Sequence, residues 1–103
     1  MLDFIKNAFK STKVEEIKEL LNQNAVIIDV RMPYEYQGGH VVGSKNIPLA
    51  DLPNNIEHIK KLNKPVVVCC ASGMRSGQAA GILKDKGVNC LNGGSWTAVN
   101  ALV

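Results

Sequence analysis

Two adjacent cysteines, Cys69 and Cys70, end an apolar run and are followed by a turn of small residues. The stretch from residue 66 to residue 80 reads VVVCCASGMRSGQAA, and its one charged residue is Arg75. A loop of small residues that leads into a helix N-terminus directs several backbone N–H groups at one point, where they hold a negative charge. The same field lowers the pKa of a thiol, and the thiolate is the nucleophilic form. The stretch therefore predicts an anion-binding loop around one reactive sulfur.

Cys70 is the predicted nucleophile of the pair. Neighbouring residues on a strand point to opposite faces of the sheet, so we expect Cys69 to pack in the core. Cys90, in a later apolar segment, is also expected to be a small buried side chain. Arg75 is expected to place a fixed positive charge at the rim of the loop. The candidate substrate-binding residues are Arg31 and the loop residues Ala71, Ser72, Gly73, Met74, Arg75 and Ser76.

Strands and helices are needed to position this loop, and the pattern of apolar residues predicts both. Residues 25–30 (AVIIDV) and 65–70 (PVVVCC) are continuous apolar runs, which are typical of strands buried on both faces. Shorter strands are expected near residues 44–47 and 88–91. Such strands, separated by helices, predict an α/β fold with a parallel sheet covered on both faces. Ligand sites in such folds lie at the carboxyl ends of strands, which is where Cys70 stands.

Four amphipathic segments are predicted as helices, and the third is expected to open at Ser76 or Gly77. The segments are residues 11–24, 51–62, 76–87 and 95–103. Their expected apolar stripes are Val14, Ile17 and Leu21; Leu52, Ile56 and Ile59; Ala79, Ile82 and Leu83; and Trp96, Val99 and Val103. Thr12 and Glu15 are placed as a capping box for the first helix. Residues 1–11 are expected to form a short helix or flap, and residues 31–48 mostly a loop.

Composition narrows the class of protein. The 103 residues are enough for one core but too few for two domains. The net charge is +3, and the lysines are scattered without interleaved aromatic residues, which argues against nucleic-acid binding. The three cysteines lack the spacing of a disulfide framework or a zinc site, and His40 and His58 are isolated. Free thiols, with no apparent signal peptide or membrane span, predict a cytoplasmic protein.

The sequence resembles the rhodanese family over nearly all of residues 1–103. Residues 27–49 (IIDVRMPYEYQGGHVVGSKNIPL) are similar to the family's Asp-Val-Arg strand end with its following Glu, Gly-His and Asn-Ile-Pro. Residues 66–88 are similar to its active-site segment, a Cys-x-Ser-Gly-x-Arg-Ser loop that leads into a helix. Residues 91–99 (LNGGSWTAV) are similar to its Gly-Gly turn and Trp-bearing helix. The resemblance implies a single three-layer domain with a mostly parallel sheet of about five strands.

The resemblance also implies an activity, a ping-pong sulfur transfer through Cys70 without a metal or organic cofactor. The thiolate would take sulfane sulfur from thiosulfate or a persulfide and carry it as a persulfide. A thiophilic acceptor, either a thiol or a protein, would then remove it. The expected partners are therefore a small sulfur-containing anion or persulfide donor and a thiol or protein acceptor, with no nucleic acid and no membrane.

Two alternatives to this sulfurtransferase stay open. The first is a non-catalytic rhodanese-like module that binds partners, against which the retention of both Cys70 and Arg75 argues. The second is a phosphatase or arsenate reductase, because related phosphatases use a Cys-x5-Arg loop. Here the loop is Cys-x4-Arg, which is smaller and better suited to a sulfur atom than to a phosphoryl group.

For several polar or aromatic residues near the predicted site, a structural role is expected rather than a role in catalysis or binding. Arg31 could assist an anionic substrate, but an ion pair with Glu35 or another carboxylate is favoured. Asp29 is expected to accept backbone hydrogen bonds and so to order the loop that follows it. The resemblance implies a structural role for His40. Trp96 is expected to anchor the last helix in the core.

Overall fold

The computed structural model describes residues 13–103, so the expectations for residues 1–11 and for Thr12 lie outside the described residues. The described chain alternates strands with helices, as the sequence predicts. The helices are α2 (Lys13–Asn22), α3 (Pro33–Gln37), the 3₁₀ helix η1 (Leu49–Asn55), α4 (Ile56–Lys61), α5 (Met74–Asp85) and α6 (Trp96–Asn100). The strands are β1 (Val26–Asp29), β2 (Lys45–Asn46), β3 (Val66–Cys70) and β4 (Cys90–Ser95).

Within residues 13–103 the sheet has four strands in the order β2-β1-β3-β4, and all of its neighbouring strands are parallel. The expected fold class is confirmed, but the expected count of about five strands is corrected to four. The count of five came from the resemblance, and the described segments between the strands supply helices instead. In the register of β1 and β3, Asp29 pairs with Cys69. The chain leaves both strands at the same edge, which brings the segment after Asp29 close to the loop after Cys70.

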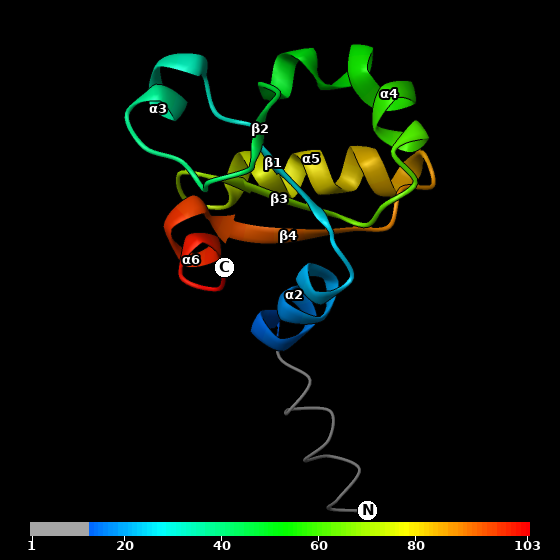
Figure 1. Ribbon diagram of the computed structural model, residues 1–103. Coiled ribbons are helices and arrows are strands. Elements are labelled where there is room, and N and C mark those ends of the chain that lie inside the picture. The colour runs from blue at the N-terminus through cyan, green and yellow to red at the C-terminus, as the bar shows by residue number, and fades with distance from the viewer. Residues whose placement is uncertain (1–12) are drawn as a thin grey trace, which may run out of the picture.

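Helices cover both faces of the sheet, as Figure 1 shows: α4 and α5 lie on one side and α2 and α6 on the other. The side chains of β3 alternate between two buried clusters. Val66, Val68 and Cys70 join the cluster under η1, α4 and α5, whereas Val67 and Cys69 join the cluster with α2 and α6. The two adjacent cysteines therefore belong to opposite layers of the protein, as the alternation along a strand predicts.

The bounds or faces of α2, α5 and α6 differ from the sequence expectations. The last helix, α6, ends at Asn100, and Val103, which was expected on its apolar stripe, is exposed. In α2 the buried residues are Ile17 and Leu20, whereas Val14 is half exposed, so the apolar stripe is rotated from the expected one. The helix after Cys70 begins at Met74, two residues before the earliest expected start. Only residues 71–73 therefore separate β3 from α5, and the predicted loop includes the first helical turn.

The segment expected to be mostly loop contains a short helix, α3, which the sequence analysis missed. Pro33 opens this helix rather than breaking the chain, because a proline in the first turn removes no helical hydrogen bond. The side chain of Glu35 accepts a hydrogen bond from the Met32 N–H at 3.1 Å, which caps the same turn. The helix therefore depends on a cap and a proline rather than on an apolar stripe.

The helix expected over residues 51–62 is divided into η1 and α4, with Pro53 inside η1. Its three expected core residues, Leu52, Ile56 and Ile59, are nevertheless all buried.

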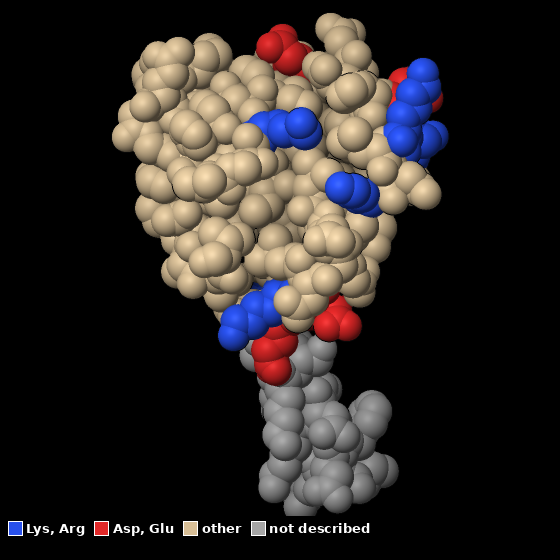
Figure 2. All heavy atoms as spheres, viewed as in Figure 1, with Lys and Arg blue, Asp and Glu red and all other residues tan. Residues whose placement is uncertain are grey.

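The lysine and arginine side chains on the face drawn in Figure 2 are spread out rather than gathered in one patch. Among the helices of residues 13–103, none combines the length and hydropathy needed to cross a membrane.

Candidate active site

Cys70 is the last residue of β3, and its sulfur receives hydrogen bonds from the loop and helix that follow. Its side chain has no surface exposed to solvent. The backbone N–H of Gly73 donates to Sγ at 3.0 Å and the N–H of Ser76 at 3.4 Å. The hydroxyl oxygen of Ser76 lies 3.3 Å from the same sulfur. Gly73 has a φ of 101°, a conformation that favours glycine and turns the loop back over the sulfur.

These donors set the pKa of the Cys70 thiol. Burial raises the pKa, but the hydrogen bonds from the Ser76 hydroxyl and from the N–H groups of Ser76, Gly73 and Ser72 outweigh it, and the pKa lies below the ordinary thiol value. Burial raises the pKa of Cys69 to about 12, with a further contribution from the charge of Asp29. The thiolate form is therefore favoured at Cys70 rather than at Cys69, while the role of Cys70 as the nucleophile stays a prediction.

Asn92, on the neighbouring strand β4, links the parts of the loop and is not among the residues predicted for the site. Its Oδ1 accepts a hydrogen bond from the Ser76 hydroxyl at 2.6 Å, and its Nδ2 donates to the Gly73 carbonyl at 3.0 Å. A signal for it exists in the sequence, since it is a polar residue that directly follows the strand expected near residues 88–91 and directly precedes two glycines. Its partners, 16 and 19 residues away, could not be read from local spacing.

Arg75 lies at the rim of the loop and forms an ion pair. Its Nη1 and Nη2 donate to the two carboxylate oxygens of Glu35 at 2.7 Å and 3.0 Å, which joins the first turn of α5 to α3. Both side chains are partly exposed. The hydrogen bonds from Arg75, with a weaker one from the Met32 N–H, lower the pKa of Glu35 to about 2. The positive charge expected at the rim is thus present and shared with a carboxylate.

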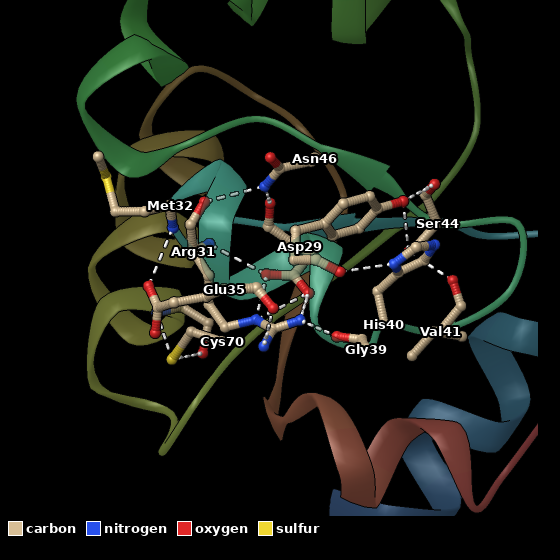
Figure 3. Close-up of polar contacts among 12 residues, drawn as sticks. Asp29, Arg31, Met32, Glu35, Gly39, His40, Val41, Ser44, Asn46 and Cys70 are labelled. Atoms are coloured by element: carbon tan, nitrogen blue, oxygen red, sulfur yellow. Dashed lines mark hydrogen bonds and ion pairs between the residues drawn. The ribbon is translucent and has the colours of Figure 1, made fainter.

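Arg31 is buried and its guanidinium contacts the protein on several sides (Figure 3). Nε and Nη2 donate to the carboxylate of Asp29 at 2.7–3.0 Å. Nη2 also donates to the Gly39 carbonyl at 2.7 Å, and Nη1 to the Glu35 carbonyl at 3.3 Å. The guanidinium carbon lies 5.0 Å from the centroid of the Trp96 ring. The favoured ion pair is therefore made with Asp29 rather than with Glu35, while a substrate contact by Arg31 stays a prediction.

His40 packs against the end of α3. Its ring stacks on that of Tyr36 with 3.7 Å between centroids, and its Nδ1 lies 2.7 Å from the Tyr36 carbonyl oxygen. The Tyr36 hydroxyl donates to the Ser44 carbonyl at 2.7 Å, which ties α3 to the segment before β2. These contacts give His40 the structural surroundings that the resemblance implies.

The predicted loop residues differ in how they meet the sulfur. Ser72, Gly73 and Ser76 supply its hydrogen bonds. Ala71 and Met74 are exposed, and 76% of the Met74 surface is accessible to solvent. Among residues 13–103, no group of His, Cys, Asp and Glu side chains is placed to hold a metal ion. The arrangement can stabilise one anionic sulfur with backbone and hydroxyl donors.

Comparison with known proteins agrees with this geometry. Residues 13–101 match the model of the rhodanese-like domain family. A thiosulfate sulfurtransferase, GlpE of Pseudoalteromonas translucida (strain TAC 125), is 36% identical over 88% of this chain and 91% of its own length. YqhL of Bacillus subtilis (strain 168) is 43% identical over 63% of this chain, and the match spans about half of that relative (51%).

Solved structures of similar fold also include rhodaneses. A rhodanese with anions from E. coli has a TM-score of 0.66 and 38% identity, over 72% of this chain and 89% of the other. The match of the family model extends over most of the chain and includes β1, β3, β4 and the loop around Cys70. The chain therefore belongs to the rhodanese-like domain family.

Proposed function

We propose that this sulfurtransferase carries sulfane sulfur as a persulfide on Cys70, between a small donor and a thiophilic acceptor. The observation that carries the proposal is the convergence on one sulfur of the N–H donors of Gly73 and Ser76, with the Ser76 hydroxyl oxygen 3.3 Å from the same sulfur. Preorganised donors of this kind stabilise an anionic sulfur without reorganising during the reaction. The family relatives named as thiosulfate sulfurtransferases support the same chemistry.

The first half-reaction is a displacement at sulfur. The Cys70 thiolate attacks the outer sulfur of thiosulfate, a new S–S bond forms, and sulfite leaves with the electrons of the broken S–S bond. A persulfide donor reacts in the same way and releases a thiolate. In the second half-reaction an acceptor such as cyanide or a thiolate attacks the outer sulfur and returns Cys70 to its thiolate form. Each half-reaction conserves charge and needs no external oxidant.

The charges at the rim favour a persulfide over thiosulfate as the donor. Arg75 shares its charge with Glu35, and Arg31 is buried against Asp29. Neither guanidinium is left as an unpaired cation that a dianion could use without displacing a carboxylate. A monoanionic persulfide places less charge at this rim, so its recognition requires less from the two arginines.

Three free cysteines suit a reducing compartment, and we place the protein in the cytoplasm.

Intact-protein mass spectrometry tests the proposal. Reduced wild type is incubated with thiosulfate or, separately, with glutathione persulfide, beside the variants Cys70→Ser and Cys69→Ser. We expect wild type and Cys69→Ser to gain one sulfur atom that cyanide or dithiothreitol removes. Cys70→Ser should gain none. The donor that loads the protein at the lower concentration identifies the preferred class.

Failure of both donors to load wild type would contradict the sulfur-carrier function. The two open alternatives would then be separated by one assay with a phosphate ester as substrate. Hydrolysis that depends on Cys70 would support a phosphatase, and its absence would support a partner-binding module.

A further inference from the structure

The hydroxyl group of Ser76 lies between two acceptors and has only one proton to donate. Its oxygen is 3.3 Å from the sulfur of Cys70 and 2.6 Å from Oδ1 of Asn92. A serine hydroxyl donates one hydrogen bond and accepts others. The hydroxyl can therefore donate to the sulfur or to the amide oxygen, but not fully to both at once.

The orientation of the Asn92 amide follows from its other two contacts. Its Oδ1 accepts a hydrogen bond from the N–H of Gly94 at 2.9 Å, and its Nδ2 donates to the carbonyl of Gly73 at 3.0 Å. A flipped amide would place two donors together at Gly94 and two acceptors together at Gly73. The atom that faces the Ser76 hydroxyl is therefore an acceptor.

The strand that carries Asn92 is held firmly at this position. Asn92 pairs with Val68 in the register of β3 and β4, and an irregularity in the pairing follows directly after it. At Gly93 an added Cβ would lie 2.6 Å from Cγ2 of Val99 and 2.8 Å from Cγ1 of Val67, so the backbone is packed too closely for a side chain. Such a bulge aims the neighbouring side chain in a fixed direction. The Asn92 oxygen is thus a rigid competitor for the Ser76 proton.

The need of the Cys70 sulfur for this proton depends on its chemical state. A thiolate sulfur is a charged acceptor and gains most from the hydroxyl donor. A thiol S–H can itself donate to the Ser76 oxygen, which leaves the hydroxyl proton for Asn92. In a persulfide the negative charge lies on the outer sulfur, so Sγ is a weak acceptor. The Ser76 hydroxyl then donates its hydrogen bond to Asn92, as it does in the thiol state.

We propose that Asn92 is a positioning residue that takes the Ser76 hydroxyl bond when Cys70 is a thiol or a persulfide and gives it up when Cys70 is a thiolate. The persulfide part of this inference rests on the proposed function, whereas the thiol part does not. Asn92 thereby stabilises the thiol and the sulfur-loaded state relative to the free thiolate. It acts on Cys70 only through the hydroxyl of Ser76.

Removal of the competing acceptor gives the first test. In Asn92→Ala the thiol state loses the hydrogen bond between the Ser76 hydroxyl and Asn92, while the hydroxyl can still donate to the thiolate. The pKa of Cys70 should therefore fall by about one unit, since a hydrogen bond has this order of strength. At a pH above that pKa, a fixed mixture of glutathione persulfide and glutathione should load the variant about tenfold less at equilibrium, since the persulfide state loses the same hydrogen bond. Asn92→Asp keeps the acceptor and adds a negative charge, so the pKa should rise.

The pH dependence of alkylation by iodoacetamide gives the thiol pKa without any sulfur transfer, and intact mass gives the loading. Asn89→Ala is the matched control, because Asn89 is an exposed residue of the same type three positions earlier. It should change neither quantity. The decisive comparison is made in a protein that already carries Ser76→Ala. There the additional change Asn92→Ala should no longer lower the pKa of Cys70. A disturbance of the loop alone would move Asn92→Ala and Asn92→Asp in the same direction.

A pKa that is unchanged or raised in Asn92→Ala would overturn the inference, and so would a fall of equal size in the Ser76→Ala background. If Asn92→Ala does not fold, the test relies on Asn92→Asp. The pKa of Cys70 should rise in that variant, and the rise should be smaller when Ser76→Ala is also present. Wild type that takes up no sulfur, with the pKa shifts as expected, would refute the sulfur-carrier function and leave the role of Asn92 in the thiol state supported.

Discussion

Cys69 and Cys70 are neighbours in one strand and are equally hidden from solvent, yet the pKa values of their thiols are shifted in opposite directions. The pKa of Cys69 is raised and that of Cys70 is lowered. Both have no exposed surface. Burial raises the pKa of Cys69 to about 12. Burial also raises the pKa of Cys70, but four hydrogen bonds from Ser76, Gly73 and Ser72 outweigh it and bring the pKa below the ordinary value.

The comparison shows that burial alone does not set the pKa of a cysteine in this protein. Cys69 faces the layer of α2 and α6, where apolar side chains surround it and the nearby charge of Asp29 opposes a thiolate. Cys70 faces the start of α5, where N–H groups converge. What separates the two residues is the face of the sheet, which a one-residue step along β3 reverses. The lowered pKa of Cys70 depends on the donors that the loop presents.

The largest expected effect is the selectivity of alkylation between the two cysteines. At about pH 8, iodoacetamide should modify Cys70 at least about 1,000-fold faster than Cys69, because a thiol of pKa about 12 is almost wholly protonated there. The rate at Cys70 should rise with pH along a titration curve whose midpoint lies below the ordinary thiol pKa, and then level off. Peptide mapping of the alkylated protein over time measures both rates.

Cys70→Ser provides the control for this experiment, since the remaining labelling should be slow and should not level off in the same range of pH. Equal labelling of Cys69 and Cys70 in the folded protein would contradict the comparison. It would mean that the donors around Cys70 do not distinguish the two thiols.

The second prediction concerns the charged pair on the side of Cys69. Arg31→Met leaves the fully buried Asp29 without its partner, and breaking a buried ion pair in this way costs about 3–5 kcal/mol of unfolding free energy. The pKa of Cys70 should change little, because Arg31 does not contact its sulfur. Urea denaturation followed by circular dichroism gives the stability.

Arg31→Lys is the companion variant to Arg31→Met, since it keeps the charge but loses the planar fork that meets Asp29 with two nitrogens. We expect an intermediate loss of stability. A large shift in the pKa of Cys70 in either variant would show that the polar groups on the two sides of β3 are not independent.

Much of the reactive side could be predicted from the sequence because its parts are local. Cys70, the small residues after it and Ser76 lie within seven residues of one another, and a strand that runs into a helix places them together. The burial of Cys69 follows from the same local pattern. Predictions of this kind need only the alternation of a strand and the geometry of a helix start.

The rest depends on partners that are distant in the sequence. Glu35 meets Arg75 across 40 residues, and Asn92 meets Ser76 across 16. Nothing in their local spacing selects these pairs. The helix α3 was missed for a different reason, because it is too short for an apolar stripe and is defined by a proline and a side-chain cap. The start of α5 was placed late because a glycine at positive φ, rather than a serine, precedes its first turn.

The third prediction alters the loop itself on the side of Cys70. In Gly73→Ala the φ of 101° becomes unfavourable, and the new Cβ would lie 3.3 Å from Cα of Gly94. We expect a loss of about 1–3 kcal/mol of unfolding free energy. The loop should also relax away from the sulfur, which weakens the N–H bond to Sγ and raises the pKa of Cys70. Gly81→Ala is the matched control, because Gly81 lies in α5 with open space around it and no positive φ.

The smallest expected effect is at the solvent-exposed rim, where Glu35 pairs with Arg75. Hydrogen bonding to Arg75 lowers the pKa of Glu35 from 4.5 to about 2, so the folded state binds this proton less readily than the unfolded state. The pair therefore contributes its stability above about pH 5 and loses it as the pH falls towards 2. Glu35→Gln should be slightly less stable than wild type near neutral pH, and the difference should shrink to nothing through this window. Urea midpoints of both proteins across the window measure it, and a difference that stays constant with pH would mean that the charge of Glu35 does not support the rim of the Cys70 site.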